Sequence, residues 1–211
     1  MPKSLSPTQT TYAAFQAAYD HFNKALFAGT LPACLITLQR KDERTLGYFW
    51  AQRFGEIGGA GRTDEIAMNP QHFIHRSARE TLSTLVHEMV HLQQQHFGAP
   101  SRSGYHNKGW AQLMIDVGLH PSSTGAPGGK QTGQKVSHYI IEGGKYDVAY
   151  RALAAKGFTL SWGELAGLED DEEEKNRSNR IKYTCELCGT NVWGKPGLSI
   201  RCGDCGCDFS P

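Results

Sequence analysis

The sequence contains no long hydrophobic run. None of its apolar stretches approaches the roughly 20 residues that a membrane-spanning helix requires. The opening segment, MPKSLSPTQTTY, lacks the apolar region of a secretory signal peptide. The whole chain has a formal net charge of only +1, so it lacks the general positive excess that would attract nucleic acid. We therefore expect a soluble, cytoplasmic protein without a membrane partner, on which any basic surface is local.

Cysteine is scarce until the end of the chain, where five of the six cysteines lie within the last 27 residues. This clustering favours metal binding in a reducing compartment over a disulfide framework. Cys185 and Cys188 form one C-x-x-C pair, and Cys202 and Cys205 form a second one after 13 intervening residues. Four thiolates at this spacing predict a closed, structural zinc site, with Cys207 as an alternative to Cys205. So small a module would need the metal in order to fold.

The segment Thr84–Leu92 reads TLVHEMVHL and contains the pattern H-E-x-x-H. In a helix, His87 and His91 lie one turn apart on the same face and can bind one metal ion, most often zinc. Glu88 cannot face the metal directly, but it can take a proton from a water molecule bound there. Because the surrounding residues are largely apolar, we expect this helix to be buried, where histidines without a metal or a partner are rare.

A catalytic zinc site needs a third protein ligand. The metzincin spacing would require Gly and His where this chain has Gln94 and Phe97, and the thermolysin type would require a Glu in a segment that contains none until Glu142. Several other donors follow the motif: His96, His106, Asp116, His120 and His138. We predict His106 as the ligand, because it begins a second helix that can fold back on the first, with Asp116 in reserve.

The remaining pattern predicts an α+β fold, a zincin-like core with a small antiparallel or mixed sheet. An aromatic face predicts a helix over residues 11–28. Strands are expected at 35–38, 47–50 and 65–68, of which the last is our choice for the edge that holds a substrate backbone. Further elements follow the metal helix, which should run from about Ser77 to Phe97: a second helix ending near 118, a flexible Gly-rich loop at 121–134, a strand at 136–141 and a helix at 148–155.

We expect three regions: a metalloprotease domain over residues 1–168, a charged linker over 169–181 and a zinc ribbon over 182–211. Basic residues outnumber acidic ones in and just before the ribbon. Trp193 and Tyr183 offer faces on which bases can stack, so single-stranded DNA is a candidate partner.

Several segments together resemble the SprT-like zinc metalloproteases, which include the DNA–protein-crosslink protease Spartan: LVHEMVHLQQ, GYHNKGW, LHPSSTGAPGGKQTGQ, HYI, YTCELCGTNVWGKPG and RCGDCG. The chain is most similar to the short bacterial or phage type. The resemblance implies that His87, His91 and His106 bind a catalytic zinc ion and that Glu88 is the catalytic base. It also implies a protein or peptide substrate, with DNA-associated proteins as candidates.

The sequence thus predicts a zinc endopeptidase with one catalytic and one structural zinc ion. Tyr105 and Tyr139 are candidate donors to the oxyanion formed during peptide hydrolysis, and the 121–134 loop is a candidate gate. The alternative is a non-enzymatic, nucleic-acid-binding zinc-ribbon protein in which the histidine site is structural. The intact Glu88 favours the enzyme, because a structural site does not need that carboxylate.

Overall fold

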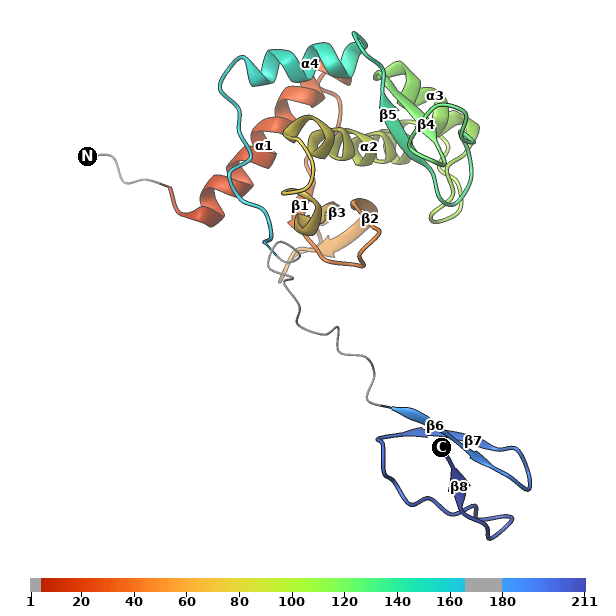
Figure 1. The fold of residues 1–211 in the computed structure, drawn as a ribbon. Helices are drawn as coiled ribbons and strands as arrows, with labels where there is room; N and C mark the ends of the chain where they lie inside the picture. The colour runs from red at the N-terminus through yellow and green to blue at the C-terminus, as the bar shows by residue number, and fades with distance from the viewer. Residues whose placement is uncertain (1–4, 166–179) are drawn as a thin grey trace. The chain divides into compact units, whose positions relative to one another are not determined.

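The computed structural model describes residues 5–165 and 180–211 and divides the chain into two compact units, Met1–Ala166 and Gly167–Pro211 (Figure 1). Nearly all of the expected linker at 169–181 lies outside the described residues. Ile181 already belongs to the first strand of the second unit. The first unit mixes helices with small sheets, as predicted.

Helix α1 (Pro7–Leu26) begins earlier than its aromatic pattern indicated. Ser6 caps it, accepting a hydrogen bond from the Gln9 backbone N–H, while the Gln9 side chain accepts one from the Ser6 N–H. This reciprocal capping satisfies two of the free N–H groups of the first turn. The aromatic face of α1 packs into the core of the unit through Phe15, Tyr19 and Phe22.

Three strands form one mixed sheet in the order β1-β3-β2: β1 (Leu35–Leu38), β2 (Gly47–Gly55) and β3 (Arg62–Met68). Strand β3 pairs with β1 in parallel and with β2 antiparallel, so it is the central strand. The expectation that 65–68 is a free edge for a substrate was therefore wrong. A period-two pattern predicts a strand but does not tell which strands flank it.

Helix α2 (Ala78–Phe97) follows a short 3-10 turn (Pro70–His72) and runs through the middle of the first unit (Figure 1). A second capping box, between Ser77 and Glu80, begins it. Every residue from Thr81 to Val90 is buried. A helix buried on all sides needs neighbours on all sides. Here they are α1, the strands β2 and β3, and α3 (Lys108–Asp116).

The remaining elements of this unit are β4 (Leu119–Ser122), β5 (Ser137–Ile140) and α4 (Lys145–Ala154). Strands β4 and β5 pair antiparallel, and α4 packs beside α1 (Figure 1). The segment expected to be a flexible loop includes the second half of β4. Its turn is closed by hydrogen bonds, among them the Ser123 N–H to the Lys130 carbonyl (2.8 Å). Polar composition alone does not reveal such internal bonding.

The second unit contains three short strands in the order β7-β6-β8: β6 (Ile181–Cys185), β7 (Asn191–Gly194) and β8 (Phe209–Ser210). Tyr183 is buried, and its hydroxyl donates to the Lys195 carbonyl (2.7 Å). The expectation that Tyr183 offers a stacking face was therefore wrong, because its side chain is on the inner face of β6.

In both units, no helix of the described residues is long and apolar enough to cross a membrane.

The close approach of β2 to α2 depends on Gly47. A Cβ atom there would lie 2.9 Å from the Ala67 carbonyl oxygen and 3.0 Å from the Thr84 Cγ2 atom. We predict that Gly47→Ala lowers the free energy of unfolding by about 1–3 kcal/mol, because it forces the strand away from the helix. Gly55 in the same strand is the matched control, since an added Cβ meets only the Gly61 oxygen at 3.9 Å. Chemical denaturation of both variants checks this, and equal losses would contradict it.

Candidate metal centre

The structure brings His87, His91 and His106 together. One ligand atom from each imidazole can be chosen so that all three lie within 4.8 Å of one another. His87 and His91 come from successive turns of α2, as four-residue spacing requires. His106 comes from the segment just before α3. The ring centroids are separated by 5.3 Å (His87–His91), 5.6 Å (His87–His106) and 4.9 Å (His91–His106).

The start of α3 is joined to the end of α2 by Asn107, the residue after His106. The Asn107 side-chain oxygen caps α3 by accepting the Trp110 N–H (2.9 Å), and it also accepts from the Gln94 side chain of α2 (2.9 Å). Gln94 is buried, so this bond is shielded from water. The bond therefore fixes the distance between the two helices at the point where His106 meets the other two histidines.

Trp110 forms the inner wall of the cluster. It is fully buried, and its ring centroid lies 4.9 Å from that of His87, 5.0 Å from that of His91 and 4.3 Å from that of His106. The His91 ring is nearly parallel to it, at 21°. A rigid indole in contact with all three rings limits their rotation, so the cluster is ordered by packing as well as by hydrogen bonds.

The outer nitrogen of His106 is held by the Gly-rich segment after β4. The His106 Nδ1 lies 3.1 Å from the Gly133 carbonyl oxygen, which can only accept, so Nδ1 carries the proton and Nε2 keeps its lone pair. The backbone groups of the two residues also exchange hydrogen bonds, of 2.8 Å and 3.0 Å. Such a contact to the outer nitrogen orients a metal-ligating histidine.

The imidazoles are electrically neutral at pH 7. Burial lowers the pKa of His91 to about 3, and it lowers the pKa of His87 well below its ordinary value, with the nearby imidazoles adding to the effect. Burial also lowers the pKa of His106, against the opposing hydrogen bond to Gly133. Three neutral imidazoles keep their lone pairs, which is the state in which histidine binds metal ions.

Glu88 is buried beside the cluster, and the backbone of Phe49 in β2 lies near its carboxyl. Burial raises the pKa of Glu88 to about 8, because the charged form is poorly solvated there. The Phe49 ring is parallel to the His91 ring, at 9° with 6.5 Å between centroids. Strand β2, rather than the predicted 65–68, is therefore the strand that runs beside the histidines.

The other predicted donors lie elsewhere. Asp116 is exposed at the end of α3 and accepts from Gln112 (2.9 Å). The His96 Nε2 pairs with the Asp64 carboxylate (2.6 Å). The His120 ring stacks on Tyr139, with centroids 4.8 Å apart.

His138 does contact the cluster, although it is not part of the group of three. Its Nδ1 lies 3.1 Å from the Nδ1 of His87. The sequence indicates His138 only as a candidate ligand. A contact between His138 and His87 cannot be read from the sequence, because the two residues are 51 positions apart.

Neither candidate oxyanion donor has a hydrogen bond to the cluster within the part of the chain that the structure describes. Tyr139 follows His138 in β5, and successive residues of a strand point to opposite faces, so its ring lies against His120 and away from His87. Tyr105 is partly buried next to His106, and the Arg102 guanidinium lies over its ring at 5.3 Å. Of the two, the geometry therefore favours Tyr105.

In the second unit, the four predicted cysteines Cys185, Cys188, Cys202 and Cys205 have sulfur atoms within 4.8 Å of one another. Each pair sits on a tight turn that ends in a glycine with positive φ, Gly189 at 71° and Gly206 at 66°. The Gly189 N–H donates to the Cys185 carbonyl, and the Gly206 N–H to the Cys202 carbonyl. Cys207 lies next to this group, with its sulfur 3.3 Å from that of Cys185. The arrangement fits a tetrahedral metal ion.

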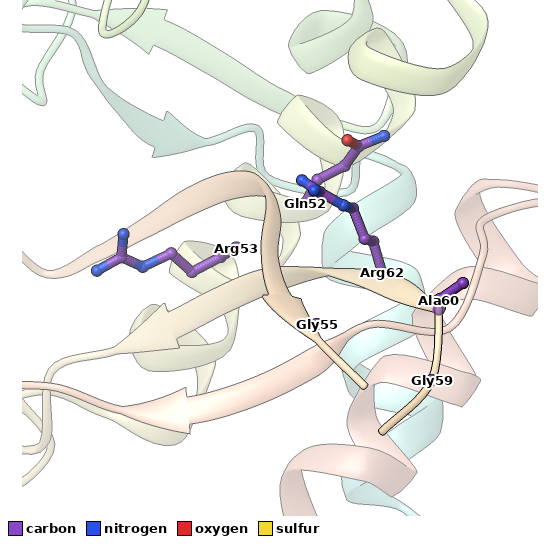
Figure 2. Close-up of a pocket in the computed structure, with 7 residues that line it drawn as sticks. Gln52, Arg53, Gly55, Gly59, Ala60 and Arg62 are labelled. Carbon is purple, nitrogen blue, oxygen red and sulfur yellow. The ribbon is translucent and has the colours of Figure 1, made fainter. Parts of the chain in front are cut away.

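A separate hollow lies in the hairpin that connects β2 and β3 (Figure 2). The Gln52 and Arg62 side chains extend on one side of this hairpin and Arg53 on the other. Gln52 has a positive φ of 50° in a bulge of β2, and its N–H donates to the Asp64 carboxylate (2.7 Å). The lining contains none of the clustered histidines.

The raised pKa of Glu88 makes a prediction for the metal-free protein. Its carboxyl titrates at about 8 in the folded protein against an ordinary value of 4.5. The folded state thus binds the extra proton between these values, and the associated stability falls as the pH rises through this range. Glu88→Gln does not titrate, so relative to the parent it should gain up to a few kcal/mol of stability between pH 5 and pH 8. Denaturation after chelation checks this, and parallel pH curves for the two proteins would rule it out.

Comparison with known proteins places this centre in a family. The model of the SprT-like family matches residues 15–130, a range that includes all three clustered histidines and Glu88. The chain is also 50% identical over 60 residues to a Salmonella typhimurium protein described as an uncharacterized protein in the mucB 3' region, covering 28% of this chain and 80% of that relative. No solved structure matches the chain. SprT-like proteins are generally zinc-metalloprotease-like, and this chain belongs to the SprT-like family.

Proposed function

We propose that this protein is a zinc-dependent endopeptidase with a zincin-like core. The observation that carries the proposal is the convergence of three neutral imidazoles, His87, His91 and His106, next to the buried carboxyl of Glu88. Burying four ionisable groups side by side is costly unless they serve a common purpose. Metal binding by the imidazoles and proton transfer by the carboxyl account for all four.

The donor set fits zinc. Three imidazole nitrogens, with no further ligand among the residues that the structure describes, leave one tetrahedral position open, as in catalytic rather than structural zinc sites. Bound there, zinc would polarise a peptide carbonyl and acidify a water molecule. In the second unit, four thiolates would fill the tetrahedron completely, which fits a structural ion. We therefore infer two zinc ions per chain, one catalytic and one structural.

Glu88 is the proposed general base. Its raised pKa, about 8, suits a group that takes a proton from water and then donates it to the leaving amine near neutral pH. Its carboxyl lies near the Phe49 backbone of β2. Tyr105 is a candidate for stabilising the oxyanion.

The substrate is proposed to bind as an extended strand along β2. Within the described residues β2 pairs only with β3, so its other edge is free to pair with a peptide. Phe49 of this strand stacks on His91 and lies near Glu88, so β2 runs beside the histidines. A backbone held there would have its peptide bonds beside the proposed metal.

The proposal predicts that Glu88→Gln retains two zinc ions but loses at least about 100-fold in proteolysis, since general acid–base catalysis contributes about 10²–10⁴. Cleavage of an unstructured protein such as casein, with metal content measured on the same samples, checks this. His106→Ala is the companion variant and should retain one zinc ion. If Glu88→Gln cleaved as fast as the parent, Glu88 would not be the base. If the parent cleaved nothing, the alternative of a non-enzymatic zinc protein would gain support.

We further propose that the second unit binds single-stranded DNA and that the substrates include proteins associated with this DNA. Trp193 in β7 is 63% exposed and is paired across the strands with Lys182 in β6. An exposed indole beside a lysine suits the stacking of a base next to a phosphate. Tyr183 cannot contribute, since it is buried in the same unit. Two of the basic residues just before the ribbon, Lys175 and Arg177, lie outside the described residues.

This predicts that Trp193→Ala weakens the binding of a single-stranded oligonucleotide by about fivefold or more, because stacking contributes about 1–3 kcal/mol per base. Leu187→Ala, which truncates another exposed apolar side chain of the second unit (73% exposed), should leave the affinity unchanged. Fluorescence anisotropy at two salt concentrations measures both. Binding that is absent, or that does not weaken with salt, would contradict the proposal.

A further inference from the structure

His138 in β5 touches His87 on the side away from the other clustered histidines. Its two ring nitrogens are both engaged: Nδ1 lies 3.1 Å from the His87 Nδ1, and Nε2 lies 2.8 Å from the Ser83 hydroxyl. The Ser83 hydroxyl in turn donates to the Glu80 carbonyl oxygen (2.8 Å). The four groups form one chain of hydrogen bonds from His87 to the first turn of α2.

The proton positions along this chain follow from its last member. The Glu80 carbonyl can only accept, and it also accepts from the Arg76 guanidinium (2.7 Å). Ser83 has a single proton, which it gives to this carbonyl, so its oxygen must accept from the His138 Nε2–H. A neutral His138 then offers a lone pair at Nδ1, and the proton between the two rings belongs to the His87 Nδ1.

This order of protons determines what His87 can do. With its proton on Nδ1, the free lone pair of His87 is on Nε2. The opposite order, in which Ser83 donates to His138, would put the His87 proton on Nε2 and block that nitrogen. The chain therefore selects the tautomer that is able to bind a cation through Nε2.

We propose that His138 is a positioning residue, which fixes the tautomer and the ring orientation of His87 for metal binding. This rests on the proposed function in one respect, that His87 is a metal ligand. His138 is not a further ligand in this account, because neither of its nitrogens is free. Its action on His87 parallels that of the Gly133 carbonyl on His106. Two of the three imidazoles are thus oriented by groups from the segment after α3.

The test compares zinc affinity at the histidine site in the full chain, by competition with a chelator. The site is identified as the one that His106→Ala removes. His138→Phe keeps the ring shape but can neither accept nor donate, and should bind zinc about 10–100-fold more weakly. His138→Gln can accept from His87 and donate to Ser83, and should recover affinity to within about fivefold of the parent. His120→Phe, at a histidine of the neighbouring strand, is the matched control and should bind as the parent does.

A second readout does not depend on metal affinity. In the metal-free parent, nitrogen NMR shifts should show His87 protonated at Nδ1, and in His138→Phe this preference should be lost. Unchanged zinc affinity together with an unchanged tautomer in His138→Phe would overturn the inference. Loss of zinc in His138→Gln as complete as in His106→Ala would also overturn it, by making His138 a ligand. Absence of zinc from the histidine site of the parent would instead contradict the proposed function.

Discussion

The structure of the first unit depends on one constraint: polar imidazoles and a carboxyl are buried on and around its central helix. Helix α2 is buried over ten consecutive residues, and these include His87 and Glu88 as well as the apolar core. Polar groups at such positions are tolerated only when their hydrogen-bonding and charge requirements are met. Much of the surrounding fold supplies those requirements.

Each neighbouring element contributes a specific contact. Strand β2 brings the Phe49 backbone near Glu88, and it can approach closely because Gly47 has no side chain. The start of α3 brings His106, with Asn107 bonded to α2, and Trp110 packs against all three rings. The segment after β4 and strand β5 hold the outer nitrogens of His106 and His87. Metal binding and folding are therefore expected to be coupled, since the same contacts serve both.

Much of this could be predicted from the sequence, because the strongest signals are local. The helical period predicts that His87 and His91 lie on one face of α2 and that α2 is buried. The residue pattern likewise predicts the strand at 35–38. The two C-x-x-C pairs likewise predict a four-cysteine cluster, which the structure contains. His106 could be predicted as the third ligand only by assuming that the chain turns back after α2. The resemblance to SprT-like proteins supports that assumption.

What could not be predicted depends on contacts between distant residues. The neighbours of a strand are set by the whole sheet, so 65–68 was mistaken for an edge. The inward orientation of Tyr183 follows from the pairing of a small sheet, and the contact between His138 and His87 joins β5 to α2. Such contacts have no local periodicity, and a single sequence does not display them.

The most direct test of the account is a crystal structure of the zinc-loaded protein, with anomalous scattering measured at the zinc absorption edge. The account predicts an anomalous peak about 2.0–2.1 Å from one nitrogen each of His87, His91 and His106, with no fourth protein ligand. No peak at these three histidines, or a peak bound to His138 in place of one of them, would contradict it.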